Sequence, residues 1–209
     1  MDSNLQVRNF GLQLTNRKMK SSKFIQSIDT LSNKSTVIIL GIVAHLVFLL
    51  MMVFTFPVIN EAIGGPAFDL RTFGYSLADA NMIVGNLTSE TRDLYVFAQL
   101  GLLDVLYPVL LACFLATLLN RLLRVNSKQQ QFWYLLLVPF IGMLFDYAEN
   151  VMVFMMIQDH IALNSLVVGI SSLFTQLKGG FTMITWACVL WQTGVWIIGK
   201  ARGKALQFS

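Results

Sequence analysis

Residues 36–56, TVIILGIVAHLVFLLMMVFTF, decide the class of fold. This stretch has no Asp, Glu, Lys or Arg, and its 21 residues would form a helix about 31 Å long, the thickness of a bilayer's hydrocarbon layer. We therefore predict a membrane-spanning helix that Pro57 closes. The whole chain agrees: of 209 residues 56% are hydrophobic and only 12% charged, with a mean hydropathy of +0.65. Soluble domains carry about 25% charged residues.

Three further apolar stretches predict three more spans, at about 94–119, 132–157 and 168–198. The expected fold is all-α: a polytopic membrane protein whose domain at 36–199 is a bundle of four transmembrane helices. An acidic outer loop at 57–93 joins the first two spans. The last stretch, 161–199, has Lys178-Gly179-Gly180 in its middle, so it could form one long helix or two short segments. We favour one helix, because it keeps the basic C-terminal tail, 200–209, on the same side as the basic N-terminal tail, 1–35.

The charge distribution orients this bundle and bears on its partners. Lys and Arg concentrate in residues 1–34, in the connection at 120–131 and at the C-terminus. The positive-inside rule then places both termini in the cytoplasm. Basic residues that flank spans, with no interleaved aromatic stripe, argue against nucleic acid and for membrane lipids as partners. In the N-terminal tail, apolar residues at helical spacing predict a short helix at the membrane interface: Phe24, Ile25, Ile28 and Leu31.

Four ionisable residues lie inside the predicted spans: Asp104, Asp146, Glu149 and Lys178. A charge at the bilayer centre costs at least ~2.5–3.5 kcal/mol, so such residues are rare and mark functional sites. Counted along their helices at ~1.5 Å per residue, all four fall in one layer slightly to the outer side of the midplane. Asn150 shares a helix face with Asp146 and Glu149. We predict that these five residues bind a ligand or protons.

The neighbouring polar residues favour the same interpretation. Ser171, Thr175, Lys178, Thr182 and Thr185 form a stripe that would face the bundle interior. We expect Thr175 and Thr182, together with Tyr107 and Tyr147 from the second and third spans, to support the site.

Charge balance limits what this site can hold. Three carboxylates and one ammonium leave a surplus of two negative charges, which a low dielectric does not tolerate. Either one or two carboxyls hold protons, or a cation completes the balance. That cation would be Arg71 or Arg92 from the outer loop, or a cationic ligand.

Three functions fit these residues. The leading one is the binding or transport of a small cationic or protonatable solute, or of protons. The first alternative is a membrane enzyme that acts on a lipid or isoprenoid-like substrate by carboxylate acid–base chemistry. The second is an accessory or assembly subunit whose charges form structural ion pairs. Four helices are few for a transporter, which favours a homo-oligomer.

Other signals in the sequence are sparse. With only two His and two separate Cys, we expect no metal site and no cofactor, and the sequence singles out no catalytic residue. Asn86-Leu87-Thr88 is a glycosylation sequon, usable if the outer loop is lumenal or extracellular. The sequence predicts an integral multi-pass membrane protein and does not distinguish the plasma membrane from endomembranes.

Three short motifs carry a resemblance. The first is Leu103-Asp104 followed by Pro108 (LDxxxP), the second is Asp146-Tyr147-Ala148-Glu149-Asn150 (DxxEN), and the third is Thr175-Gln176-Leu177-Lys178 (TxxK). Over about residues 75–195 the chain resembles an uncharacterised family of small four-span membrane proteins that has these motifs. The resemblance implies the same charged positions and no particular chemistry.

Overall fold

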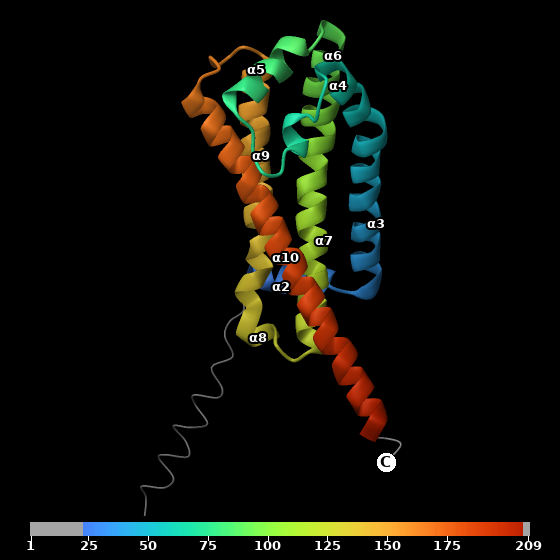
Figure 1. The fold of residues 1–209 in the computed structure, drawn as a ribbon. Coiled ribbons are helices and arrows are strands. Elements are labelled where there is room, and N and C mark those ends of the chain that lie inside the picture. The colour runs from blue at the N-terminus through green and yellow to red at the C-terminus, as the bar shows by residue number, and fades with distance from the viewer. Residues whose placement is uncertain (1–22, 207–209) are drawn as a thin grey trace, which may run out of the picture.

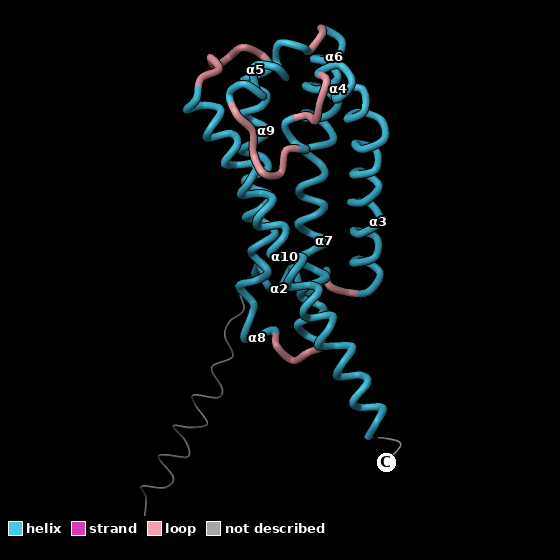
Figure 2. The backbone as a smooth tube through the Cα atoms, viewed as in Figure 1, coloured by secondary structure: helices cyan, strands magenta, loops and turns pink. Residues whose placement is uncertain are grey.

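The computed structural model describes residues 23–206, which are helical apart from short connections (Figures 1 and 2). Within these residues, four helices are long and apolar enough to cross a bilayer: Lys34–Ile63, Ser89–Val125, Trp133–Ile157 and Ser165–Arg202. This confirms the prediction of an all-helical, multi-pass bundle. Most of the basic N-terminal tail lies outside the described residues.

The first span does not end at Pro57 as we predicted. It consists of α3 (Lys34–Leu50), a π-helical turn, η1 (Met51–Thr55), and α4 (Phe56–Ile63). In the π turn the backbone N–H of Phe56 bonds to the carbonyl of Met51, five residues back. The wider turn makes room for the proline ring, which would otherwise clash with the preceding turn of an α-helix. The helix therefore continues until Gly64, which ends it with a left-handed φ of 75°.

The second span begins with α6 (Ser89–Asp93), continues as a second π-helical segment, η3 (Leu94–Leu103), and becomes α7 (Asp104–Val125). The backbone N–H of Asp104 bonds to the carbonyl of Gln99, which closes the last π turn. Pro108 lies inside α7. Backbone irregularities in the first two spans thus fall at the depth of the predicted site.

The third and fourth spans pack against each other. The third comprises α8 (Gln129–Phe132), η4 (Trp133–Leu137) and α9 (Val138–Ile157), with Pro139 in its first turn. The fourth, α10 (Ser165–Leu206), is one continuous helix of 42 residues, as the charge bias favoured. At ~1.5 Å per residue it is about 63 Å long, twice the hydrocarbon thickness. It crosses the bundle diagonally and projects beyond the other helices at its C-terminal end (Figure 1).

Residues 64–88, which we call the cap, cover one end of the bundle. They contain η2 (Phe68–Leu70) and α5 (Leu77–Asn86), which begins with a capping box between Ser76 and Asp79. Hydrogen bonds from Ser76, with the Arg71 guanidinium nearby, lower the pKa of Asp79. Tyr75 fastens the cap to α10, because its backbone N–H and its hydroxyl donate to Ser172 Oγ and Ser171 Oγ at 2.9 and 2.6 Å. Burial raises the pKa of Tyr75, so it remains a neutral donor.

The opposite end, which we call the terminal end, has an apolar core. The short helix α2 (Lys23–Leu31) lies there and packs on α7, with Ile25 and Ile28 buried and Phe24 and Leu31 more exposed. Around Ile28 the core consists of Ala116, Leu119, Leu123, Leu136 and Val189.

The helices are not all in mutual contact. In the described part of the chain α7 is central: α3, α9 and α10 all pack on it, α10 packs most extensively on α9, and α3 and α10 share no such interface. Gly142 permits the close approach of α9 to α10, since a Cβ there would lie 3.3 Å from Phe181 Cβ. Gly180, by contrast, has open space where a Cβ would lie.

This difference predicts the effect of two matched substitutions. A helical Gly→Ala change on its own stabilises by up to about 1 kcal/mol, and we expect Gly180→Ala to be neutral or stabilising. Gly142→Ala should instead lower the midpoint of thermal unfolding of the purified protein in detergent, because overpacking costs about 1–3 kcal/mol. Equal midpoints for the two variants would contradict the close α9–α10 contact.

Candidate functional site

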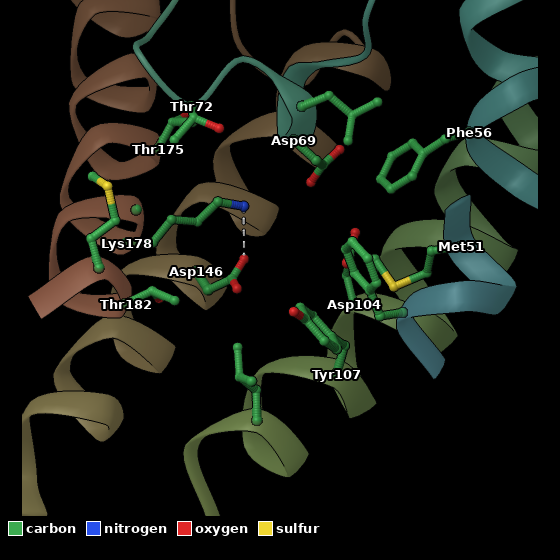
Figure 3. Close-up of a pocket in the computed structure, with 15 residues that line it drawn as sticks. Met51, Phe56, Asp69, Thr72, Asp104, Tyr107, Asp146, Thr175, Lys178 and Thr182 are labelled. Carbon is green, nitrogen blue, oxygen red and sulfur yellow. Dashed lines mark hydrogen bonds and ion pairs between the residues drawn. The ribbon is translucent and has the colours of Figure 1, made fainter. Parts of the chain in front are cut away.

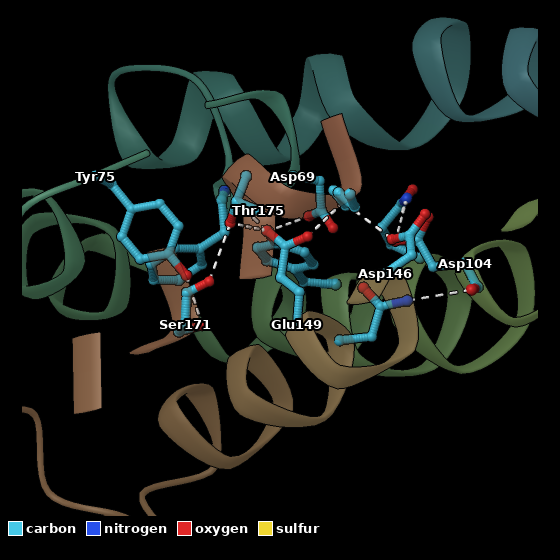
Figure 4. A network of polar contacts seen from close by, with 12 residues as sticks. Asp69, Tyr75, Asp104, Asp146, Glu149, Ser171 and Thr175 are labelled. Carbon is cyan, nitrogen blue, oxygen red and sulfur yellow. Dashed lines mark hydrogen bonds and ion pairs between the residues drawn. The ribbon is translucent and has the colours of Figure 1, made fainter. Parts of the chain in front are cut away.

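The site is a polar network at the cap-side half of the bundle (Figure 4). Lys178 of α10 is its cation. Its Nζ lies 3.0 Å from Asp146 Oδ1 and also contacts Glu149 Oε2, both on α9. Glu149 is fully buried, and its other carboxylate oxygen accepts a hydrogen bond from the hydroxyl of Thr175, one turn before Lys178. The DxxEN and TxxK motifs are therefore one interlocked unit across the α9–α10 interface.

Asp104 faces this unit from α7. It is 3% exposed, and its Oδ2 accepts a hydrogen bond of 2.8 Å from Gln99 Nε2. Gln99 is itself held by Thr55, whose hydroxyl donates to Gln99 Oε1. Because the π-helical segments η1 and η3 contain Thr55 and Gln99, the two irregular turns together position the carboxyl of Asp104.

A fourth carboxylate, Asp69, comes from the cap. Its Oδ2 accepts a hydrogen bond of 2.6 Å from Tyr95 Oη, while Tyr95 Oη accepts one from the backbone N–H of Phe68. Asp69 Oδ1 is buried and accepts no hydrogen bond. Sequence reasoning missed Asp69 because it lies in an acidic loop that we expected to stay outside the membrane. The sequence feature that could have revealed Asp69 is its position between Phe68 and Leu70, because two apolar neighbours predict a segment packed against the bundle.

Asn150, in the DxxEN motif, links α9 to the LDxxxP motif on α7. Pro108 has no N–H, so the carbonyl of Asp104, four residues earlier, lacks its helical donor. Asn150 Nδ2 donates to this carbonyl at 3.2 Å, and Tyr147 Oη donates to the next carbonyl, that of Val105, at 2.8 Å. Asn150 and Tyr147 therefore stabilise the proline-containing turn and do not contact the space between the charges.

That space is a cavity of about 270 Å³ (Figure 3). Polar groups from the second, third and fourth spans and from the cap surround it: Asp69, Thr72, Asp104, Tyr107, Asp146, Thr175, Lys178 and Thr182. The apolar part of its wall is Phe48, Met51, Phe56, Leu70, Leu111 and Met183. Asp69, Asp104 and Tyr107 face Lys178 and Asp146 across the cavity (Figure 3).

Apolar packing closes the cavity toward the terminal end. A void of about 10 Å³ lies beyond Asp146 and Thr182, lined otherwise by apolar side chains and Gly142. Farther along α7, Leu115, Leu119 and Leu123 are at most 1% exposed. These three leucines form an apolar layer between the cavity and the terminal end.

The network carries more negative charge than it neutralises. Among the described residues four carboxyls, Asp69, Asp104, Asp146 and Glu149, share one cation, Lys178, which leaves a surplus of three negative charges if all are ionised. The loop arginines do not complete the balance. Arg71 pairs with Asp79 at 2.8 Å, and Arg92 donates to the carbonyl of Ile157 at 2.9 Å. Protons or a cationic ligand remain to do so.

Two other sequence features are the glycosylation sequon and the metal-ligating residue types. Asn86 of the sequon is exposed, and its Nδ2 donates to the carbonyl of Ile63 at 3.1 Å, where it joins the cap to the end of α4. Among residues 23–206 no group of three or more His, Cys, Asp or Glu side chains is arranged to hold a metal ion.

Comparisons with protein-family models, with curated proteins and with solved structures give no match to this chain. The chemistry of the site is therefore inferred from its own geometry.

The contact between Asn150 and the Asp104 carbonyl predicts a non-additive pair of substitutions. Asn150→Leu should destabilise the protein by about 1–3 kcal/mol, because it leaves a buried carbonyl without a donor. In a Pro108→Ala background the alanine N–H can serve this carbonyl, and Asn150→Leu should then cost much less. Thermal unfolding of the four proteins of this cycle measures the coupling. Additive costs would mean that Asn150 acts elsewhere.

The ion pairs of Lys178 predict a specific rescue. Lys178→Met should destabilise by about 3–5 kcal/mol, since it leaves two buried carboxylates without their cation. Adding Glu149→Gln or Asp146→Asn should recover part of the loss, whereas Asp104→Asn, which does not contact Lys178, should recover less. Yield and unfolding midpoint in detergent report the result, with the exposed Lys200→Met as the control. Equal rescue by all three changes would contradict this pairing.

Proposed function

We propose that this chain is a membrane protein, with both termini in the cytoplasm, that binds a small cationic or protonatable solute in the acidic cavity. The observation that carries the proposal is the surplus of carboxyls around the cavity. In a low dielectric such a surplus is tolerated only if protons or a cation neutralise it.

The carboxyls divide into two groups. Asp146 and Glu149 are ion-paired with Lys178, and they hold α9 to α10. Asp104 and Asp69 are held only by neutral donors, Gln99 and Tyr95, so their charges lack a counter-ion. We infer that a ligand ammonium lies between Asp69 and Asp104, with Tyr107 beside it. We call Lys178 with Asp146 and Glu149 the Lys178 group, and Asp69 with Asp104 the Asp69 group. The Lys178 group then has the structural role that an accessory subunit would need, and the Asp69 group binds the ligand.

Binding fits this conformation better than conduction. The apolar layer of Leu115, Leu119 and Leu123 separates the cavity from the terminal end, so a solute crosses only if that layer opens. Protons and the ligand compete for the same carboxyl oxygens. Uptake of a cation therefore releases protons, and binding weakens as the pH falls.

A second candidate is supported by the same pair of carboxyls. Asp69 and Asp104, opposite Lys178, are suited to acid–base chemistry on a lipid or isoprenoid-like substrate. The two functions are separated by recovering the ligand after incubation with the protein. A binding protein returns it unchanged in stoichiometric amount, and an enzyme converts many equivalents.

The test of binding uses a charged probe and its neutral counterpart. We expect the purified full chain in lipid nanodiscs to bind butylammonium but not butanol in isothermal titration calorimetry. Asp104→Asn should weaken butylammonium binding about tenfold or more, the scale of one hydrogen bond to a charged group. Asp69→Asn should act similarly, which guards against a folding defect in one variant.

Glu61→Gln is the matched control, because Glu61 is exposed on α4, away from the cavity. It should leave the affinity unchanged. Equal binding of butanol, or no effect of both cavity variants, would exclude a cation site.

A further inference from the structure

We infer that the ligand is an amphiphilic amine with a single hydrocarbon chain, which reaches the cavity sideways from the bilayer between α3 and α10. This inference rests on the proposed function, since it assigns the ligand class of the same cavity. It depends on the route into the cavity and on the apolar part of its wall.

Packed residues cover the two ends of the bundle. At the cap end, Asp69 and Tyr75 hold the cap to Tyr95 and to α10 by buried hydrogen bonds, and the ion pair of Arg71 with Asp79 braces it. At the terminal end the apolar layer blocks passage. A ligand from either aqueous phase would have to disrupt one of these layers.

The side of the bundle is open at the level of the cavity. The helices α3 and α10 both pack on α7 but share no extensive interface among the described residues, and Figure 1 shows them on opposite sides of α7 in the cap-side half. Phe48 of α3 and Met183 of α10 both line the cavity and are 37% and 57% exposed. These two side chains therefore form the rim of a mouth that faces the lipid.

The wall combines apolar and charged residues. Phe48 and Met183 are exposed, Met51 and Phe56 are buried, and the carboxyls of Asp69 and Asp104 belong to the same wall. A soluble ammonium ion would have to leave water and pass this apolar rim. An amphiphile that already lies in the bilayer keeps its chain in hydrocarbon and moves only its head group, which the carboxyls then neutralise.

The size of the cavity agrees with a head group. Small-molecule sites usually measure about 300–1,000 Å³, and this one, at about 270 Å³, lies just below that range. It accommodates an amine and the first part of a chain, so the rest of the chain must extend through the mouth. Met and Phe side chains at the rim suit such a contact, because methionine adapts its shape to a flexible chain.

The experiment compares chain lengths and blocks the mouth. The full chain in phosphatidylcholine nanodiscs is titrated with dodecylammonium and butylammonium, with empty nanodiscs to correct for partition into lipid. Met183→Trp places a bulky ring at the rim, and Leu173→Trp places the same ring on another lipid-exposed part of α10 as the control. We expect Met183→Trp to weaken dodecylammonium binding about tenfold and butylammonium binding by less than about twofold. Leu173→Trp should change neither.

The outcomes separate this inference from the proposed function. If wild-type protein binds both amines equally once partition is corrected, or Met183→Trp weakens both or neither, the lateral route is wrong and the cation site stands. If neither amine is sensitive to Asp104→Asn, the proposed function itself fails. Should Met183→Trp not fold, the chain-length comparison on the wild type decides alone.

Discussion

The constraint on which this structure depends is that hydrocarbon offers no water to a charged or polar group. Every such group in the four spans must therefore find its partner inside the protein. Lys178 illustrates the consequence: its ammonium takes two carboxylates from α9, and Thr175 completes the coordination of one of them. These contacts lie in the largest helix–helix interface of the bundle, so the ion pairs and the packing of α9 on α10 depend on each other.

The same constraint explains where the backbone is irregular. Two π-helical segments and Pro108 occur beside the cavity, and each leaves a backbone or side-chain group to be satisfied. At Asp104, Gln99 donates a hydrogen bond to the side-chain carboxyl and Asn150 donates one to the backbone carbonyl. A regular helix would have offered no reason for Asn150 to approach Asp104. The LDxxxP and DxxEN motifs are thus coupled through a main-chain carbonyl as well as through charge.

The sequence predicted the elements whose cause is local. Apolar stretches and basic flanks identified four spans and favoured a single last helix, because length, hydropathy and charge are properties of each segment. Two features were missed. Pro57 does not end the first helix, because a π turn accommodates its ring. Asp69 reaches the cavity because Tyr95, on another span, holds it there. Neither the π turn nor this tertiary contact leaves a periodic signal in the sequence.

The division of the carboxyls determines how the cavity behaves when it is empty. The Lys178 group is neutralised internally apart from one charge, since two carboxylates share one ammonium. Asp69 and Asp104 add two more, opposite a group that is already negative. We propose that protons or a bound ammonium neutralise this surplus. In this proposal ligand and proton are alternative ways of meeting one electrostatic requirement, so exchange between them leaves the charge buried in the membrane almost unchanged. Because the proposed exchange is nearly neutral, it does not expose an uncompensated charge to lipid.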